Sequence, residues 1–489
     1  MWLRMKVLLI NLQGVYPPIG LGYLASSLEA SSIPVEILDC GGMGYTRDQL
    51  LDLVARDVSA RDPDIVGIEC YTPQVELVEQ VARVVKAHRP YCTVVLGGPH
   101  PTMDPLDAVS IPDVDLAVVG EGERTIVEVA KSVEPWRDLS EVKGIVYKKD
   151  GRTVENQPRS PIQNLDEIPF PAYHLFPVFK LSLEIDAHGV MTRRHPYMPI
   201  ITSRGCPFGC IYCHKVHGKT FRARSPENVL EEMRFLYNKY RVREFHVEDD
   251  CFNLDMDRAK RFCDLVAESG LDIALKFPNG LRADRIDEEL MVKMKRAGTY
   301  SISLGVETAS PRVMKTIGKS LDLQKVRDAV GLALKHGLQV RGFFMIGFPG
   351  ETKDDIRQTI DFAQSLGVHF ASFSVATPFP GTELYRIAEE NGYLGEKRPS
   401  QLPYANPMME TPDFTRDELR AIKRRAEDDF YSQPERVSTL SGMTFSRGEL
   451  VDYYSSPLLD YYYLLLVEHF STYGSASTFY VREDEQPKK

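Results

Sequence analysis

Three cysteines stand close together in the sequence, with a spacing that suits metal chemistry. Cys206, Cys210 and Cys213 form a C-x3-C-x2-C segment directly after the apolar residues 199–201. Three thiolates on one short loop can hold three irons of a four-iron cluster and leave the fourth iron open for a ligand that is not protein. The segment therefore predicts a reactive iron–sulfur site.

Two other uses of these cysteines, a structural zinc site and a disulfide framework, are less favoured. A structural zinc site could be completed by His214 or His217, but such sites usually take their ligands in two pairs, and no second C-x2-C occurs in the chain. A disulfide framework is less favoured, because no N-terminal signal sequence is recognisable and the other cysteines are scattered. Those are Cys40, Cys70, Cys92, Cys251 and Cys263.

The cysteine segment and its flanks, with Tyr212 just before the third cysteine, resemble the signature of the radical S-adenosylmethionine superfamily. The resemblance implies a 4Fe-4S cluster whose open iron binds the amino and carboxylate groups of S-adenosylmethionine. It also implies that one electron from the cluster cleaves this molecule to methionine and a 5′-deoxyadenosyl radical, which abstracts a hydrogen atom from the substrate. Arg204, His214 and Lys215 flank the loop and could tune its charge.

Length and composition limit the remaining possibilities. A chain of 489 residues is too long for one ordinary core and suggests two to four domains. Its 43% hydrophobic and 26% charged residues are typical of a soluble globular protein. The net charge of -10 disfavours nucleic acid as a partner, although the basic stretch 215–224 could still bind a phosphate.

No apolar run reaches the roughly 18 residues that a membrane-spanning helix needs. The nearest candidate, residues 461–467, is bracketed by Asp460 and Glu468 and predicts a buried or interfacial helix. We therefore expect a cytoplasmic protein without a membrane span.

Residues 5–130 alternate short apolar strands with helical patterns. The alternation predicts an α/β fold with a doubly wound, Rossmann-like parallel sheet, in which ligands lie beyond the carboxyl ends of the strands. The expected strands are 6–10, 35–38, 65–68, 93–96 and 116–119, and the expected helices are 21–30, 46–60, 74–88 and 123–133. The glycine fingerprint of dinucleotide-binding folds is absent from the first turn, so a nicotinamide cofactor is not expected.

This half of the chain resembles the cobalamin-binding domain that precedes many radical S-adenosylmethionine enzymes. The matching segments are 17–25, 97–102 and 119–123. The D-x-H-x-x-G sequence that supplies a cobalt-ligating histidine is absent, so the resemblance is to the subgroup without it. The residues expected near cobalamin are Gln13, Tyr71, Thr72, Gly97, Gly98, His100, Gly120, Glu121, Gly122 and Glu123.

Several alternatives stay open for this domain. His100 could ligate cobalt, but a histidine hydrogen-bonded within its loop is favoured. The fold could have lost its ligand and serve only as an interaction platform. A methylthiotransferase arrangement would use Cys40, Cys70 and Cys92 for a second cluster. Cys92 precedes its strand whereas the other two follow theirs, so the three thiols are expected at opposite sheet edges.

The rest of the chain is predicted to hold a connector, a barrel and a cap. We expect the cobalamin-binding domain over 1–133, a connector with a hairpin at 142–155 over 134–195, a partial (β/α)6 TIM-type barrel over 196–400 and a mainly helical cap over 401–489. The expected barrel strands are 200–202, 244–247, 274–277, 301–304, 340–346 and 372–375, with helices at 226–240 and 256–269. The cysteine loop follows the first of these strands, where barrels carry functional groups.

Other strand ends carry polar residues that match the superfamily's S-adenosylmethionine-binding positions. By this resemblance the contacts with that molecule come from Glu248, Asp249, Asp250, Asn279, Arg282, Glu307 and Gly347. The carboxylates would accept hydrogen bonds from its ammonium or ribose groups.

Together these resemblances imply a cobalamin-dependent radical S-adenosylmethionine enzyme that transfers a methyl group to carbon. Ring closure or contraction, carbon–carbon coupling, oxidative cyclisation and a non-catalytic cofactor-binding module are the alternatives. We expect a small-molecule, lipid-like or natural-product substrate and an electron donor such as flavodoxin or ferredoxin. Substrate identity, the lower cobalt ligand, oligomeric state and the role of residues after 400 do not follow from the sequence.

Overall fold

The structure is a computed structural model of the whole chain. It describes residues 5–12, 17–41, 45–132, 138–176, 192–395, 407–436 and 439. The chain forms two compact units, Met1–Arg420 and Ala421–Lys489, and both large sheets lie in the first. Within the described ranges, no helix has the length and apolarity needed to cross a bilayer. The apolar run at 461–467, the aromatic stretch after Val451 and the tail at 483–489 lie outside these ranges.

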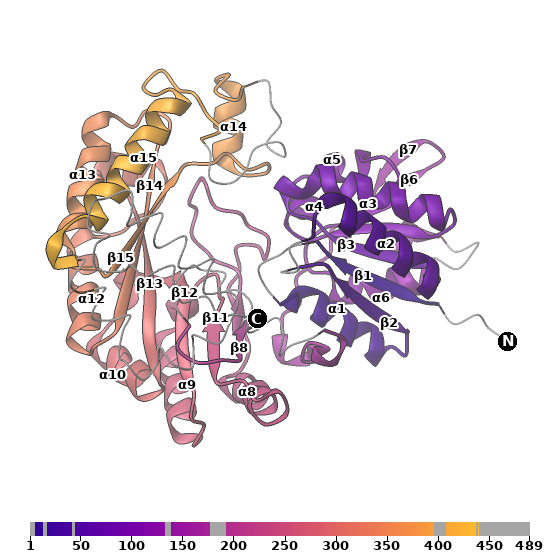
Figure 1. Cartoon of the computed structure of the whole chain (residues 1–489), viewed down its shortest axis with the longest axis horizontal. Helices are drawn as coiled ribbons and strands as arrows, with labels where there is room; N and C mark the ends of the chain where they lie inside the picture. Colours follow the sequence, from indigo (N-terminus) through magenta and orange to yellow (C-terminus); the bar gives the residue numbers. More distant parts are fainter. Residues whose placement is uncertain are drawn as a thin grey trace, which may run out of the picture. The chain divides into compact units, whose positions relative to one another are not determined.

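Seven strands form the first sheet, in the order β2-β1-β3-β4-β5-β6-β7 (Figure 1). The first five pair in parallel, and their order is that of a doubly wound sheet. This confirms the predicted fold of the first half. The strands are β1 Val7–Asn11, β2 Val35–Asp39, β3 Ile65–Glu69, β4 Thr93–Gly97 and β5 Leu116–Val118.

Helices cover both faces of this sheet. α1 (Ile19–Ala30) contacts α6 (Glu123–Ser132), and α2 (Arg47–Arg61) contacts α3 (Val75–His88); Figure 1 shows the two pairs on opposite faces. Burial on both faces explains why every residue of β1 is apolar or buried. α2 begins at a capping box in which Thr46 and Gln49 satisfy each other's backbone N–H groups.

Two short helices were not predicted. α4 (Pro99–Met103) and α5 (Pro105–Ser110) occupy what the sequence suggested was a loop after β4. Each begins with proline, which suits the first helical position because its missing N–H would have no helical partner there. Asp104 also caps α5 by accepting a hydrogen bond from the N–H of Asp107.

The predicted hairpin is present as β6 (Ile145–Lys149) and β7 (Arg152–Glu155). β6 pairs antiparallel with β5, so the hairpin extends the first sheet. The chain that follows contacts both halves of the first unit. The N–H of Ala172 donates to the carbonyl of Gly22 in α1, and the N–H of Ser225 donates to Asp166. Residues 177–191 lie outside the described ranges.

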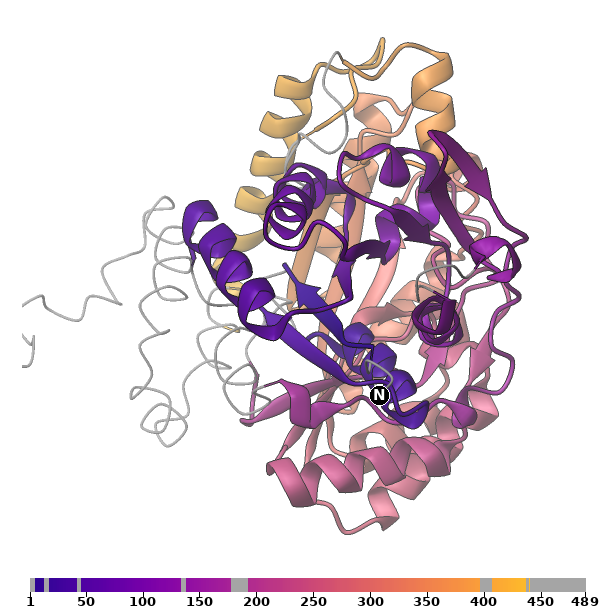
Figure 2. The same ribbon diagram turned by 90° about the vertical axis from the view of Figure 1, so that its right-hand side faces the viewer.

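Six parallel strands form the second sheet in chain order, which agrees with a partial barrel (Figure 1; Figure 2 gives the view at 90°). They are β8 Tyr197–Ile200, β11 Glu244–Val247, β12 Ala274–Leu281, β13 Thr299–Glu307, β14 Gln339–Ile346 and β15 Phe370–Val375. β14 alternates half-buried with buried residues, as expected when one face packs on helices and the other faces the barrel interior.

Helices follow these strands. α8 begins at Ser225, whose hydroxyl caps the helix ahead of Pro226. The helices are α8 Pro226–Tyr240, α9 Met256–Glu268, α10 Glu288–Arg296, α11 Pro311–Thr316, α12 Leu323–Lys335, α13 Lys353–Ser365, α14 Glu383–Glu390 and α15 Arg416–Tyr431. α15 lies in the segment 401–489, which was predicted to be mainly helical.

The first barrel strand was predicted too far along the chain. β8 ends at Ile200, and a separate two-residue strand, β9 (Ser203–Arg204), pairs antiparallel with β10 (Arg222–Ala223). The strand stops because the N–H of Thr202 donates to the side chain of Asp249 rather than to a neighbouring strand. We call the β9–β10 pair the ribbon.

Candidate functional site

The cysteine loop begins where the ribbon ends. Arg204 is the last residue of β9, and Cys206 follows it after one glycine. Cys206 is partly exposed, Cys210 is buried and Cys213 is exposed. The loop therefore presents its thiols at the carboxyl end of the second sheet, where the sequence predicted them.

Gly205 makes a tight turn at the start of this loop. Its φ is +85°, and a Cβ added there would lie 2.3 Å from the carbonyl oxygen of Thr220, so only glycine fits. Its N–H donates to Asp250 Oδ2 at 2.8 Å, and His217 Nδ1 lies 3.0 Å from the same oxygen. Asp250 thus ties the loop to the end of β11.

Asp249 holds the residues just before the loop. Its Oδ1 accepts a hydrogen bond from the N–H of Thr202 at 2.6 Å, and its Oδ2 accepts bonds from the hydroxyls of Thr202 and Ser203. The side chain is 3% exposed, and this burial raises the pKa of Asp249. Both oxygens are therefore already engaged by the protein, although the sequence suggested a contact with S-adenosylmethionine.

Cys251 is a neighbour of the cluster loop that the sequence analysis missed. It is buried, and its thiol hydrogen-bonds to Cys206. This contact lowers the pKa of Cys206 and thereby favours its thiolate form. Thiolate is the form that binds iron. The sequence signal that could have identified Cys251 was its position directly after the acidic residues predicted to end a strand, Glu248 to Asp250.

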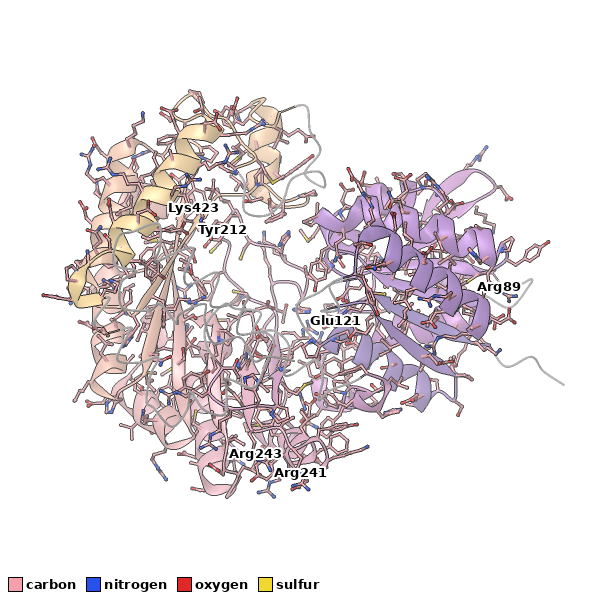
Figure 3. All side chains as sticks on the ribbon, viewed as in Figure 1. Arg89, Glu121, Tyr212, Arg241, Arg243 and Lys423 are labelled. Carbon is pink, nitrogen blue, oxygen red and sulfur yellow. The ribbon has the colours of Figure 1, made fainter. Side chains whose placement is uncertain are left out.

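The far side of the loop rests on later barrel segments. The ring of Tyr212 lies 5.6 Å from that of Phe348, and His214 packs 4.7 Å from the ring of Phe379. The N–H of Ile211 donates to the carbonyl of Ile317. Tyr212, labelled in Figure 3, is thus a packing residue of the loop.

The cysteines have the donor chemistry that an iron–sulfur cluster needs. Cys206, Cys210 and Cys213 are three thiols on one loop, and each would bind one iron of a four-iron cluster. Among the side chains that the structure describes, no group of three of Cys, His, Asp or Glu is arranged to hold a single metal ion.

The next strand ends brace the same region. Asn279 donates from its side chain to the carbonyls of Glu248 and Asp249, at 3.3 and 3.1 Å. The guanidinium of Arg282 lies 3.6 Å from the centre of the Phe208 ring in the cysteine loop, and it also pairs with Asp284. These groups come together near the loop, as the sequence predicted.

Glu307 and Gly347 end the following two strands. Glu307 has a φ of +71° and pairs with Lys319 at 2.8 Å. The N–H groups of Gly347 and Phe348 donate to Glu351 Oε2 at 2.6 and 3.1 Å. Glu351 is fully buried, and burial raises its pKa to about 7. The sequence analysis identified neither Lys319 nor Glu351 as part of the site.

Residues predicted near cobalamin gather at the carboxyl ends of β3 and β4. The hydroxyl of Tyr71 lies 3.5 Å from Glu69 Oε1, and burial raises the pKa of Glu69 to about 7. His100 is 2% exposed; its Nδ1 lies 3.4 Å from Thr72 Oγ1, and its Nε2 lies 3.2 Å from Asp107. His100 is thus engaged by protein groups on neighbouring segments of its own domain.

The glycines of these turns differ in the space around them. A Cβ added at Gly97 or Gly120 would meet no atom within 4 Å, whereas Gly98 packs against Glu69 and Cys70, and Gly122 packs against Leu24. Open space at Gly97 and Gly120 is what a large ligand close to backbone requires. The residues present therefore fit a corrin at this edge. Gln13 lies outside the described ranges.

Glu121 and Glu123 are paired with arginines of the ribbon. Arg204 lies 3.1 Å from Glu121 and 2.6 Å from Glu123, and Arg222 lies 2.8 Å from Glu121 (Figure 3 labels Glu121). The positive charges of Arg204 and Arg222 keep the pKa of Glu121 below its usual value despite burial. The two carboxylates predicted to approach cobalamin thus hold the strand before the cysteine loop.

The three N-terminal cysteines do not form a common site. Cys40 and Cys70 follow β2 and β3, whereas Cys92 precedes β4. All three are buried, and burial raises the pKa of Cys40 and of Cys92 to about 12. They are therefore neutral thiols at opposite edges of the sheet and do not support a second cluster.

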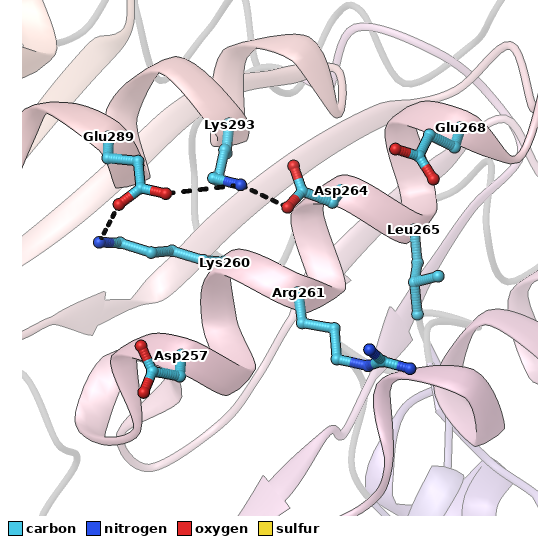
Figure 4. Close-up of a pocket in the computed structure, with 8 residues that line it drawn as sticks. All are labelled: Asp257, Lys260, Arg261, Asp264, Leu265, Glu268, Glu289 and Lys293. Carbon is cyan, nitrogen blue, oxygen red and sulfur yellow. Dashed lines mark hydrogen bonds and ion pairs between the residues drawn. The ribbon is translucent and has the colours of Figure 1, made fainter.

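A surface hollow between α9 and α10 lies among paired charges (Figure 4). Lys260 binds Glu289 and Asp287, and Lys293 pairs with Asp264. None of the residues predicted to bind a cofactor lines it. We assign this hollow no role in the chemistry.

Comparison with known families matches both halves of the chain. Residues 200–363 match the radical SAM superfamily, and residues 5–130 match the B12 binding domain. The first match covers β11 to β14 of the second sheet, and the second covers the five parallel strands of the first sheet.

Individual relatives match over most of their length. An uncharacterized methyltransferase of Pyrococcus horikoshii is 36% identical over 422 residues, which cover 86% of this chain and 88% of that protein. Cytidylyl-2-hydroxyethylphosphonate methyltransferase of Streptomyces wedmorensis is 29% identical over 86% of this chain and 87% of its own length. The structure of the radical S-adenosylmethionine methyltransferase TsrM from Kitasatospora setae superposes with a TM-score of 0.68 at 21% identity, covering 79% of this chain and 76% of that one.

Proposed function

This chain belongs to the cobalamin-dependent enzymes of the radical S-adenosylmethionine superfamily, and from that premise we propose that it replaces a carbon-bound hydrogen of a small molecule with a methyl group. The observation that supports this most directly is the position of Arg204. It ends the strand before the cysteine loop and pairs with Glu121 and Glu123, which follow the last parallel strand of the B12-binding sheet. The two predicted cofactor regions are therefore neighbours within one unit of the chain.

We assign the cofactors to residues as follows. Cys206, Cys210 and Cys213 would hold the cluster. Glu248, Asp250, Asn279, Arg282, Glu307 and Gly347 would surround S-adenosylmethionine. The open turns at Gly97 and Gly120, with Tyr71 and Thr72, would receive cobalamin. When bound, these groups supply the 5′-deoxyadenosyl radical and the methyl donor. The protein's own part is to fix their distance and to exclude water.

The proposal has a defined material balance. Two molecules of S-adenosylmethionine and two electrons convert one substrate C–H into C–CH3. One molecule yields methionine and 5′-deoxyadenosine, which carries the substrate hydrogen, and the other yields S-adenosylhomocysteine. A radical cyclase would form 5′-deoxyadenosine without S-adenosylhomocysteine. A polar methyltransferase would form only S-adenosylhomocysteine.

The electrons need an external source. We propose flavodoxin or ferredoxin as the donor and the cytoplasm as the compartment, since thiolate-bound clusters persist in reducing surroundings. Cytidylyl-2-hydroxyethylphosphonate, named for the Streptomyces relative, is a suitable first compound to test, followed by natural-product and lipid-like extracts.

The decisive experiment is an anaerobic turnover with cobalamin supplied and methyl-labelled S-adenosylmethionine. We expect labelled product, 5′-deoxyadenosine and S-adenosylhomocysteine in equal amounts. Label that never reaches cobalamin or any product would refute methyl transfer. A Cys210→Ala variant should form neither 5′-deoxyadenosine nor labelled product. Reconstituted protein with an intact cluster that cleaves no S-adenosylmethionine would favour a non-catalytic role.

A further inference from the structure

Four buried charged side chains join the ribbon to the turn after β5. Arg204 of β9 and Arg222 of β10 are paired in register, and both reach Glu121. Arg204 also reaches Glu123 at 2.6 Å. We call these four residues the clamp.

The clamp is closed off from solvent and balanced in charge. Each of its side chains is between 3% and 7% exposed, and two guanidinium groups face two carboxylates. A buried charge that loses its partner is strongly destabilising, so each member needs the others. The guanidinium of Arg204 donates to two different carboxylates, and it sets direction as well as distance because its donors are fixed in one plane.

Backbone contacts hold both sides of the clamp. Glu121 Oε2 accepts a hydrogen bond from the N–H of Ile162 at 2.6 Å, and Arg222 donates to the carbonyl of the same residue at 2.7 Å. Arg222 also donates to the carbonyl of His217 at 3.0 Å, within the segment that follows the cysteines. The clamp is thus tied to the connector and to the far end of the cysteine loop.

We propose that the clamp is a positioning device that sets the distance between the cluster loop and the cobalamin-binding turn. The proposal rests on the proposed function, since it assigns a shared purpose to the two cofactor regions. Arg204 is two residues before Cys206, and Glu121 and Glu123 flank Gly122 in the turn that carries the open position Gly120. A change in the clamp therefore moves one region relative to the other.

Such a device matters because the substrate carbon must meet two reagents. A misplacement of about 1 Å can cost on the order of a hundredfold in rate. Loosening the clamp should leave each cofactor bound and reactive, while the two cease to act on one carbon. This result would distinguish a positioning role of the clamp from a role in binding a cofactor.

The test compares Glu123→Gln and Arg204→Lys with the wild type in anaerobically reconstituted holoenzyme. Glu128→Gln is the matched control, because Glu128 lies on the same helix and pairs with Arg159 instead of with the ribbon. Electron paramagnetic resonance of samples that contain cob(II)alamin and the reduced cluster measures their spin–spin interaction. Iron, cobalamin, 5′-deoxyadenosine and methylated product are measured in the same samples.

We expect both clamp variants to retain iron, cobalamin and 5′-deoxyadenosine formation. Their spin–spin interaction should change, and product per 5′-deoxyadenosine should fall by about tenfold or more. An unchanged interaction and ratio would overturn the proposal. Loss of cobalamin from Glu123→Gln would also overturn it, because Glu123 would then be a cofactor ligand.

Failure of the proposed function and failure of the clamp proposal give different results. If the wild type forms no methylated product, the proposed function fails, and the spin–spin interaction still decides the clamp. If a variant binds neither cofactor, hydrogen exchange of the apoprotein decides between a positioning role and a stability role for the clamp. Faster exchange confined to residues 203–223 supports the clamp, whereas faster exchange throughout both sheets assigns it a stability role only and overturns the proposal.

Discussion

Asp249 accepts two hydrogen bonds from Thr202: the backbone N–H donates to Asp249 Oδ1 at 2.6 Å, and the hydroxyl donates to Oδ2. The two residues lie 47 positions apart in the chain. This contact ends the first barrel strand and fixes the direction in which the chain enters the cysteine loop. Asp249 thus acts through the loop rather than on a substrate.

This relationship predicts different results for two substitutions. Asp249→Ala leaves one N–H and two hydroxyls without their acceptor, at about 1–3 kcal/mol for each buried group, so iron content and thermal stability should fall. Asp249→Asn should largely rescue both, because its carbonyl can accept the N–H while its amide donates to the hydroxyl oxygens. Iron analysis and circular dichroism measure the two effects. The exposed Asp257→Ala is the control.

A direct contact of Asp249 with S-adenosylmethionine would give another pattern. Asp249→Asn would then keep its iron and its stability while binding of S-adenosylmethionine weakened. Calorimetric titration distinguishes the two cases.

The cysteine assignment predicts the metal content of single variants. Wild-type protein should hold about four irons per chain, and Cys210→Ala should hold less than about one and form no 5′-deoxyadenosine. Cys40→Ala is the matched control, because Cys40 is also buried but lies at the end of β2. Zinc in place of iron in anaerobically purified wild type would contradict the assignment.

The open space at Gly97 predicts a loss of cobalamin affinity without a loss of fold. Gly97→Leu meets no protein atom at its Cβ but would occupy the space expected for the corrin. Crowding of this kind costs about 1–3 kcal/mol, or roughly ten- to hundredfold in affinity. Gly331→Leu in α12, where a Cβ also meets nothing within 4 Å, should leave cobalamin binding unchanged. Equal affinity in both variants, measured by absorption titration, would place cobalamin elsewhere.

Two glycines after β14 form a matched pair. Gly347 has a φ of +85° and an added Cβ would lie 2.9 Å from Leu419, whereas Gly350 has a φ of +75° and open space. Gly350→Ala should cost about 1–2 kcal/mol from backbone strain alone. Gly347→Ala should cost more stability and should weaken S-adenosylmethionine binding, because the loop after β14, which lies beside Tyr212, must shift. Chemical denaturation measures the loss of stability, and calorimetric titration measures S-adenosylmethionine binding. Equal losses of stability in the two variants would show that Leu419 moves to make room for the added methyl group.

The sequence was informative where local signals decide the structure. β11 and α8 were predicted to the residue, because β11 has apolar residues at the alternate positions Phe245 and Val247 and α8 begins at a Ser-Pro cap. The doubly wound parallel sheet followed from strand and helix alternation. The positions of the cysteine loop and its neighbouring strand ends followed in turn from parallel pairing.

What the sequence could not supply were pairings between distant residues. Glu121 and Arg204 are 83 positions apart, and neither residue type nor spacing indicates that they meet. The same holds for Cys251 beside Cys206 and for Lys319 beside Glu307. Asp249, Glu121 and Glu123 were therefore predicted to face a ligand, although they face protein groups.

Glu351 predicts a pH dependence of stability with a defined sign. Burial raises its pKa from an ordinary 4.5 to about 7, so the folded state favours the neutral acid. Its contribution to stability is fully present below pH 4.5, falls as the pH rises to about 7, and is constant above that. The loss amounts to about 3 kcal/mol at most.

Glu351→Gln tests this because glutamine resembles the neutral acid. Its carbonyl can keep the bonds from Gly347 and Phe348, and its amide takes the place of Oε1, which has no hydrogen-bond partner among the described residues. The variant and the wild type should unfold at similar temperatures near pH 5. Near pH 8 the variant should be the more stable. A constant difference across this range, or the same trend in the exposed control Asp354→Asn, would show that Glu351 is ionised in the folded protein and that another group carries the pH dependence.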